Sequence, residues 1–292
     1  MKRIFFLFSF FVLCLITANA QDSTWVNLDD SLQKGGDASL VKGTFKATQI
    51  INTPTVEAPG KGGLQFLIMH RFGRINEGGY ALFGLDNAVI RFGLDYGIND
   101  RFSIGIGRSS LEKTYDASFK WKMLRQAENK MPFTVSLYEL LTRTTLRVTD
   151  KPYFTGKYRN AYESALLIAR KFSPRLSLQA APIWLHYNLV PTSQDQNDVF
   201  AFSFGGRMKL TKRMSINAEY NLLPTDQLPG TDIFHSLSFG IDLETGGHVF
   251  QLIFSNSDGM IGPYYLGKTT GSWGNGDIFF GFNISRAFHL KK

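Results

Sequence analysis

Only one cysteine occurs in the 292 residues, Cys14, and it lies in the apolar run near the start of the chain. Once this run is removed the chain has no thiol, which excludes disulfide bonds, thiolate catalysis and cysteine-ligated zinc. After residue 20 there is no run of eighteen apolar residues, which excludes membrane-spanning helices. Charged residues are scarce, at 19% against roughly 25% in soluble domains, which disfavours a disordered chain or a coiled coil.

The first twenty residues predict a secretory signal peptide. Residues 1–3 are a short cationic start, residues 4–16 are apolar, and Ala18-Asn19-Ala20 is a small-x-small cleavage motif. The apolar run has about thirteen residues, fewer than the roughly twenty that span a bilayer, so we expect cleavage after Ala20 rather than an anchor. Loss of Lys2 and Arg3 lowers the net charge from +8 to +6, which is too diffuse to indicate a nucleic-acid partner.

Most of the remaining chain alternates apolar and polar residues with a period of two. In residues 88–96, for example, every even position is apolar. Successive side chains of a strand point to opposite faces, so each such segment is a ribbon with one apolar side and one side of Ser, Gly, Asn and charges. The segments are about ten residues long, the span of a tilted strand across hydrocarbon. Aromatic residues stand near the segment ends, as interfacial girdles require: Tyr96, Phe102, Tyr115, Trp121, Phe133, Trp184, Tyr220 and Trp273.

This pattern predicts an all-β fold, a transmembrane antiparallel up-and-down β-barrel of about twelve strands in residues 62–292. Short turns alternate with long polar connections, which is the outer-membrane pattern with the short turns in the periplasm; connections 110–113 and 125–131 fit it less clearly. An even count leaves both termini in the periplasm, and ten or fourteen strands are the alternatives to twelve. The expected strands are 62–72, 87–97, 101–109, 114–123, 132–142, 161–172, 175–188, 198–210, 213–223, 234–244, 247–255 and 276–288.

Residues 21–61 are the expected N-terminal periplasmic segment, between the signal peptide (1–20) and the barrel. Its glycines and prolines indicate a flexible linker, with docking of a partner protein as the alternative. A further alternating run, residues 45–51, would make the strand number odd if it joined the barrel. We therefore interpret this run as a short periplasmic strand or a plug.

The side of the ribbons that faces the barrel interior is predicted to carry more basic than acidic residues. One interpretation is a narrow aqueous path that favours anions, because rings of Arg and Lys lower the electrostatic barrier for negative solutes. The other is a lumen closed by paired charges, as in many small barrels. The candidate lumen-lining residues are Arg71, Arg91, Asp95, Asp116, Lys120, Lys122, Arg170, Arg207, Lys209, Glu219 and Asp242.

No constellation of residues predicts an enzyme, a cofactor site or a metal site. A lipid-facing hydrolase needs a serine and a histidine on one strand face, and neither His186 nor the other histidines have a serine at that offset; cross-strand arrangements stay open. Asp195, Asn197 and Asp198 match no complete calcium loop, so a solvated acidic stretch is the simpler interpretation. We expect the glycines of Gly105-Ile106-Gly107 to leave room for bulky neighbours in the lumen.

Several short runs resemble a Bacteroidota outer-membrane β-barrel family known only as a domain of unknown function, and the resemblance covers nearly the whole mature chain. It implies the fold and an outer-membrane location, but no substrate or catalytic residue. The runs that carry it are FKATQIIN (45–52), HRFGRIN (70–76), FGLD (83–86), LDYG (94–97), GIGR (105–108) and ARKF (169–172).

For function, the sequence predicts passage or binding of a small solute by an outer-membrane barrel of a Gram-negative bacterium. Loops 73–86 and 256–275 are expected to fold over or into the outer mouth. The main alternative is a closed barrel that anchors a periplasmic or surface protein through residues 21–61 or the long loops. A lipid hydrolase is a distant third hypothesis.

Overall fold

A computed structural model describes residues 40–128 and 130–290. The expected signal peptide and residues 21–39 of the expected N-terminal segment lie outside the described residues. None of the helices in the described part is long and apolar enough to cross a membrane.

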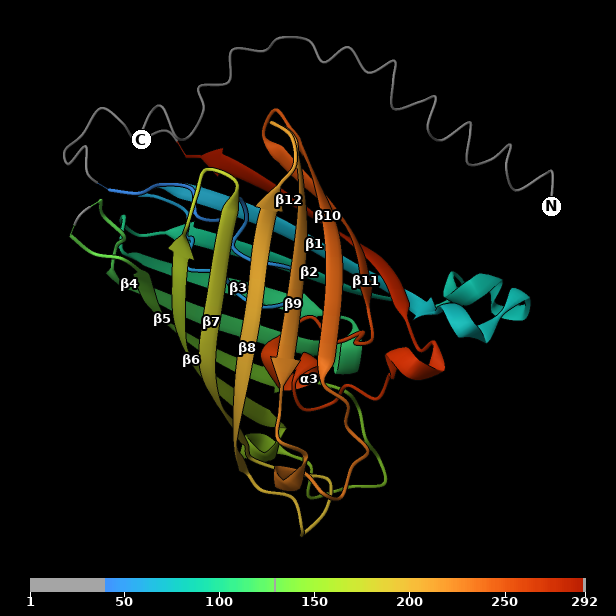
Figure 1. The fold of residues 1–292 in the computed structure, drawn as a ribbon. Coiled ribbons are helices and arrows are strands. Elements are labelled where there is room, and N and C mark those ends of the chain that lie inside the picture. Colours follow the sequence, from blue (N-terminus) through green and yellow to red (C-terminus); the bar gives the residue numbers. More distant parts are fainter. Residues whose placement is uncertain (1–39, 129, 291–292) are drawn as a thin grey trace, which may run out of the picture. The chain divides into compact units, whose positions relative to one another are not determined.

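Twelve antiparallel strands form one closed barrel, in which each strand pairs with its neighbours in sequence and β12 pairs with β1 (Figure 1). The predicted fold class and strand number are therefore confirmed. The strands are β1 Gly63–Arg74, β2 Ala88–Gly97, β3 Phe102–Ser109, β4 Thr114–Leu124, β5 Thr134–Thr144, β6 Asn160–Lys171, β7 Leu176–Tyr187, β8 Asp198–Lys209, β9 Met214–Leu222, β10 Ser236–Thr245, β11 His248–Ser255 and β12 Phe279–His289.

Each strand has one row of side chains in the barrel and one row outside it. On β8, the outward Phe200, Phe202 and Phe204 are exposed, whereas Ala201 and Ser203 between them are buried. This two-residue period follows from the pleat of the strand, and the apolar row faces outward because the polar row finds its partners inside. An apolar outer surface of this kind matches hydrocarbon rather than water.

The two ends of the barrel differ in the length of their connections. The short-turn end carries connections 98–101, 125–133, 172–175, 210–213 and 246–247. The long-loop end carries 75–87, 110–113, 145–159, 188–197, 223–235 and 256–278, so both irregular connections keep to the alternation. Short helices occur in the long-loop connections: η2 Ile75–Glu77, η3 Gly79–Gly84, η4 Leu111–Lys113, η5 Gly156–Arg159, η6 Thr225–Gln227, α3 Gly262–Tyr265 and η7 Trp273–Asn275.

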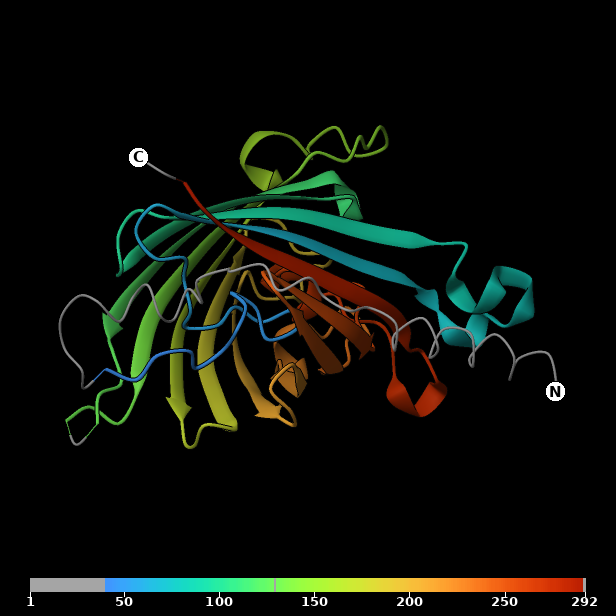
Figure 2. The same cartoon turned by 90° about the horizontal axis from the view of Figure 1, so that it is seen from above.

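Two segments fill the barrel. Residues 40–62, which we call the plug, precede β1 and run inside the ring of strands (Figure 2), where Ile51, Thr53 and Val56 are completely buried. Residues 256–278, which we call the inward loop, enter from the long-loop end and bury α3. Inward glycines make room for the plug: a Cβ on Gly205 would lie 2.6 Å from Ile50 Cδ1.

The run at 45–51 is not a strand of the barrel. It bends back on itself, and its only bridge among the described residues joins Gln49 to Pro54. Loop 73–86 also differs from expectation, because η2 and η3 extend beyond the barrel in Figures 1 and 2 and Tyr80 is fully exposed. Of the two loops expected to fold over or into the mouth, only the 256–275 region does so.

Candidate functional site

Glu219 on β9 holds the tightest turn of the plug. The amide groups of Ile51, Asn52 and Thr53 all donate to its carboxylate, at 3.2, 3.0 and 3.0 Å. The turn is closed by a hydrogen bond from Ile50 N to Thr53 O of 2.8 Å. Successive amides of a turn that converge in this way form a nest, a concave site with partial positive charge that suits an anion. Here the anion is a side chain of the barrel wall, so the wall carries the ligand and the plug carries the binding site.

Arg71 on β1 and Asn283 on β12 bind the other polar groups of the same turn. Arg71 Nη2 donates to Asn52 Oδ1 at 2.7 Å, and Arg71 Nη1 donates to Asn283 Oδ1 at 3.0 Å. Asn283 Nδ2 then donates to Ile51 O at 2.9 Å. The charges of Arg71 and Glu219 are thus both buried against one turn, where each hydrogen-bonds to plug atoms, and no direct ion pair between them is formed among the described residues.

Two glutamines satisfy backbone groups along the plug. On β7, Gln179 Nε2 donates to Pro54 O at 2.8 Å, and its Oε1 accepts from Val56 N at 3.0 Å. On β11, Gln251 Nε2 donates to Ile50 O at 2.7 Å. Because the plug is irregular, it has few backbone partners of its own, and these wall amides supply the missing ones.

Nearer the short-turn end, charged residues of β2 and β4 bind the plug. Lys120 Nζ donates to Glu57 O at 2.7 Å, and Lys122 Nζ lies 3.6 Å from the Glu57 carboxylate. Thr48 Oγ1 donates to Asp95 Oδ2 at 2.7 Å. The contacts of the plug therefore extend around most of the barrel wall. A cavity of about 10 Å³ remains beside it, room for about one water molecule.

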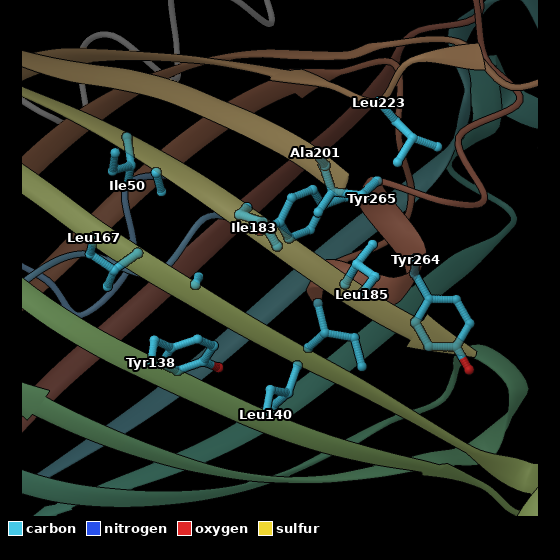
Figure 3. Close-up of a cluster of buried hydrophobic side chains, with 14 of the residues drawn as sticks. Ile50, Tyr138, Leu140, Leu167, Ile183, Leu185, Ala201, Leu223, Tyr264 and Tyr265 are labelled. Carbon is cyan, nitrogen blue, oxygen red and sulfur yellow. The ribbon is translucent and has the colours of Figure 1, made fainter. Parts of the chain in front are cut away.

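The inward loop packs against an apolar part of the barrel wall. Tyr264 and Tyr265 of α3 join a buried cluster with residues of β5 to β8 such as Leu185 and Ala201 (Figure 3). Hydrogen bonds and ion pairs also hold the loop: Tyr187 Oη donates to Pro263 O at 2.8 Å, Lys268 Nζ donates to Glu112 Oε1 at 2.6 Å, and Arg74 Nη1 donates to Asp277 Oδ1 at 3.2 Å. This part of the inner wall is apolar, which the sequence analysis did not predict.

Glu163 on β6 is the exception in that apolar wall. Its side chain is 1% exposed, and neither carboxylate oxygen has a hydrogen-bond partner among the described residues. It lies directly under α3, because a Cβ on Gly262 would fall 1.9 Å from Glu163 Oε2. The glycine at 262 allows the loop to approach this closely without displacing the Glu163 carboxylate.

All of the predicted lumen residues except Arg170 lie in inward rows, and most of them bind the plug or one another. Arg91 and Asp116 form a buried ion pair of 2.6 Å that lies over Gly107, where a Cβ would fall 2.4 Å from the guanidinium. This agrees with the expectation that the glycines of 105–107 leave room for bulky neighbours. Arg207 pairs with Asp242 at 3.7 Å and with Glu244. The inward set is Arg71, Arg91, Asp95, Asp116, Lys120, Lys122, Arg207, Lys209, Glu219 and Asp242.

The prediction that Arg170 lines the lumen is wrong. Its neighbours Ala169 and Lys171 belong to the inward row of β6, and the Arg170 guanidinium lies 5.7 Å from the Phe133 ring and 5.0 Å from the Phe172 ring on the outside. The cause of the error is the sequence 165–169, in which both rows are apolar and the alternation carries no information. Near the short-turn end, a long cationic side chain can lie along aromatic rings and reach the membrane interface.

Sequence reasoning missed several of the residues that hold the plug. Gln179, Gln251 and Asn283 are polar residues of inward rows. Their sequence context is the same as that of any other polar residue that faces the lumen. Glu163 carried a stronger signal, since it is an acid in an inward row that otherwise holds Ala161, Ala165 and Leu167.

The long loops have their own acidic contacts. Burial opposes ionisation of Asp195, but hydrogen bonds from Gly230 and Thr192 outweigh it and lower the pKa of this carboxyl. Hydrogen bonds from Asn76 and from the Ser272 amide lower the pKa of Asp277. Within the described ranges, no three His, Cys, Asp or Glu side chains are grouped so that they could hold a metal ion.

The model of one protein family matches residues 45–288, and its description is "Membrane bound beta barrel domain (DUF5777)". No curated protein sequence matches the chain. Similar solved structures include the NanC porin (TM-score 0.46, 9% identity, 78% of this chain and 100% of that chain) and the KdgM porin (0.47, 8%, 78% and 99%). A mutant of the Rh. blastica porin follows, with TM-score 0.33, 10% identity, 68% of this chain and 55% of that chain.

Proposed function

We propose, for a chain that belongs to this family of membrane-bound β-barrels, that it is an outer-membrane channel for small solutes, closed at rest by its plug. The observation that carries the proposal is the polar contact between plug and wall: Glu219, Arg71 and Lys120 each hydrogen-bond to the plug, and only Arg71 and Glu219 also hydrogen-bond to wall residues among the described contacts. If the plug leaves, these groups face a space that water can enter. The short-turn end, where the plug enters, would then face the periplasm.

A permanent seal would not require this arrangement. Side chains alone fill barrels of about eight strands, and in this wider barrel the Arg91–Asp116 pair fills part of the lumen without the plug. Charged wall residues lose hydrogen-bond partners when the plug leaves. In an apolar space this loss is costly, but water that enters the lumen can replace the plug as their partner. The architecture therefore suits a seal that can be withdrawn.

The charges that the plug covers favour a negative solute slightly. Withdrawal would free the cations Arg71, Lys120 and Lys122, against the carboxylates Asp95 and Glu219. Replacing Lys120 and Lys122 by Glu in a plug-free barrel should shift the reversal potential towards cation preference. An unchanged reversal potential would place these residues outside the conducting path.

A closed barrel that anchors a partner is the second candidate. The small residual cavity, about 10 Å³, and the dense internal contacts favour it. Recordings in planar bilayers separate the two functions. A barrel without residues 40–61 should show discrete conductance steps if it is a channel, and a second variant with a shortened inward loop should conduct more. Silence of both variants, each with the heat-dependent gel shift of a folded barrel, would favour the anchor.

A disulfide tests the role of the plug in the full-length chain. Thr53 Oγ1 lies 3.0 Å from Ser203 Oγ, close enough for a cystine in the double variant Thr53→Cys/Ser203→Cys. The sequence has no other cysteine besides Cys14, so the two single variants are clean controls. The oxidised double variant should show no conductance, because the disulfide holds the plug in the barrel. After reduction, its conductance should equal that of the single variants. Equal conductance with and without reductant would exclude plug withdrawal.

A further inference from the structure

A groove of about 760 Å³ lies on the outer surface of the barrel across β4 to β8. Most of its lining comes from outward rows, which face the membrane, so it is separate from the lumen. Its main lining residues are Phe119, Glu139, Tyr162, Trp184, His186 and Asp198.

Glu139 makes this groove unusual. It is the sixth of eleven residues of β5 and shares its outward row with Leu137 and Leu141. Among the outward positions of the twelve described strands, no other carboxylate lies away from a strand end. Acidic groups that face hydrocarbon are costly, and where they occur they usually have a partner and a function.

The partner that the structure provides satisfies only half of the carboxylate. Ser164 Oγ on β6 donates to Glu139 Oε1 at 2.7 Å. Glu139 Oε2 has no hydrogen-bond donor among the described residues. The side chain is only partly covered by protein, so a group from the membrane can reach this oxygen.

The rim of the groove towards the long-loop end is also acidic. Asp198 Oδ1 lies 2.9 Å from His186 Nδ1 and accepts from Trp184 Nε1 at 3.1 Å. Tyr162 lies opposite His186 across β6 and β7, and the Trp184 ring also lies near the His186 ring. Aromatic rings therefore border this end of the groove. The lining contains two carboxylates and neither Lys nor Arg. An anionic head group would find no cation here, whereas a cationic donor would find an acceptor.

We propose that this groove binds a membrane amphiphile that carries a primary ammonium group. An ammonium N–H donates to Glu139 Oε2, and the head group lies beside Tyr162 and Trp184, residues of the type that occupies the membrane interface. The acyl chains extend from Glu139 towards the short-turn end, over Leu137 and Val135 of the same outward row. A charge-assisted hydrogen bond in an environment with little water is strong enough to select this lipid from the bilayer.

Phosphatidylethanolamine and phosphatidylcholine are a matched pair of probes, because they share the phosphate and the acyl chains and differ in the N–H donors. Purified full-length protein is equilibrated in mixed micelles with equal amounts of both, washed, and its retained lipid is measured by mass spectrometry. We expect wild-type protein to retain at least about fivefold more phosphatidylethanolamine, and the variant Glu139→Gln to retain both equally.

Two controls separate recognition from structure. Asp86→Asn removes an equal charge from an exposed loop residue and should leave the preference unchanged. Ser164→Ala removes the internal donor to Glu139 and should keep or increase the preference for phosphatidylethanolamine. If Glu139 served only to pair with Ser164, the preference would instead be lost. Each variant must show the heat-dependent gel shift of a folded barrel. Equal retention of both lipids by wild type, an unchanged ratio in Glu139→Gln, or equally strong retention of phosphatidylglycerol would overturn the proposal.

Discussion

The plug and the inward loop fill the same lumen but are held by different chemistry. The plug forms many hydrogen bonds with wall side chains, of which Glu219 makes the most, and it also buries Ile50, Ile51 and Val56. The inward loop packs Tyr264 and Tyr265 against an apolar part of the wall, and its hydrogen bonds and ion pairs go mainly to strand ends and other loops. When a segment leaves, water can replace lost hydrogen bonds, but it cannot replace lost apolar contacts. The plug thus has more contacts that water can replace, although its apolar residues Phe45, Ile50, Ile51 and Val56 belong to the same buried cluster as Tyr264 and Tyr265 of the inward loop.

Two buried carboxylates, one beside each segment, differ in their hydrogen-bond partners. Glu219 and Glu163 are each 1% exposed, yet Glu219 accepts three plug amides and Glu163 has no donor among the described residues. Equal burial thus has opposite consequences for stability. Glu219 is satisfied and holds the plug, whereas Glu163 remains an unsatisfied polar group under α3.

The largest effect is expected for Glu219→Ala. The variant leaves three plug amides without an acceptor and Arg71 without its counter-charge, so the free energy of unfolding should fall by about 3 kcal/mol. Denaturant titration in detergent measures this loss, and limited proteolysis should show faster cleavage within residues 40–62. Glu219→Gln keeps one acceptor oxygen and should lose about half as much. A plug that stays protected in Glu219→Ala would show that the nest does not hold it.

An effect of opposite sign is expected for Glu163→Leu. Leucine has nearly the volume of glutamate and suits the apolar wall, so removal of an unsatisfied buried carboxyl should raise the free energy of unfolding by about 1 to 2 kcal/mol. The same titration measures the gain, and the protection of the plug should not change. Destabilisation instead would mean that Glu163 has a stabilising partner.

A smaller effect is expected for Thr53→Val. The hydroxyl of Thr53 hydrogen-bonds to Ser203 Oγ and Asn221 Oδ1 of the wall, both at 3.0 Å, and its loss should cost about 1 kcal/mol and speed cleavage of the plug. Thr55→Val is the matched control, because the Thr55 hydroxyl donates to Ala47 O within the plug at 2.8 Å. Equal cleavage rates in the two variants would contradict the importance of the wall contacts.

The strands could be predicted because their signal is local. The alternation in residues 88–96 or 198–210 is visible in any short window, and it located β2 and β8 closely. It failed where both rows are apolar, and Arg170 was placed on the wrong face for that reason. The plug contacts gave no such signal: Ile51 and Glu219 are 168 residues apart, and nothing near either of them indicates the other.

The sequence alone determined that the chain forms a barrel of about twelve strands with an apolar outer surface, because the two faces of each strand appear as an alternation of period two within that strand. Only the tertiary structure decided what fills the barrel. A turn with three free amides and a buried acid become partners when closure of the ring brings them together, and a glycine at 262 becomes necessary only when α3 lies over Glu163. Such contacts depend on distances across the lumen, which no local pattern of residues encodes.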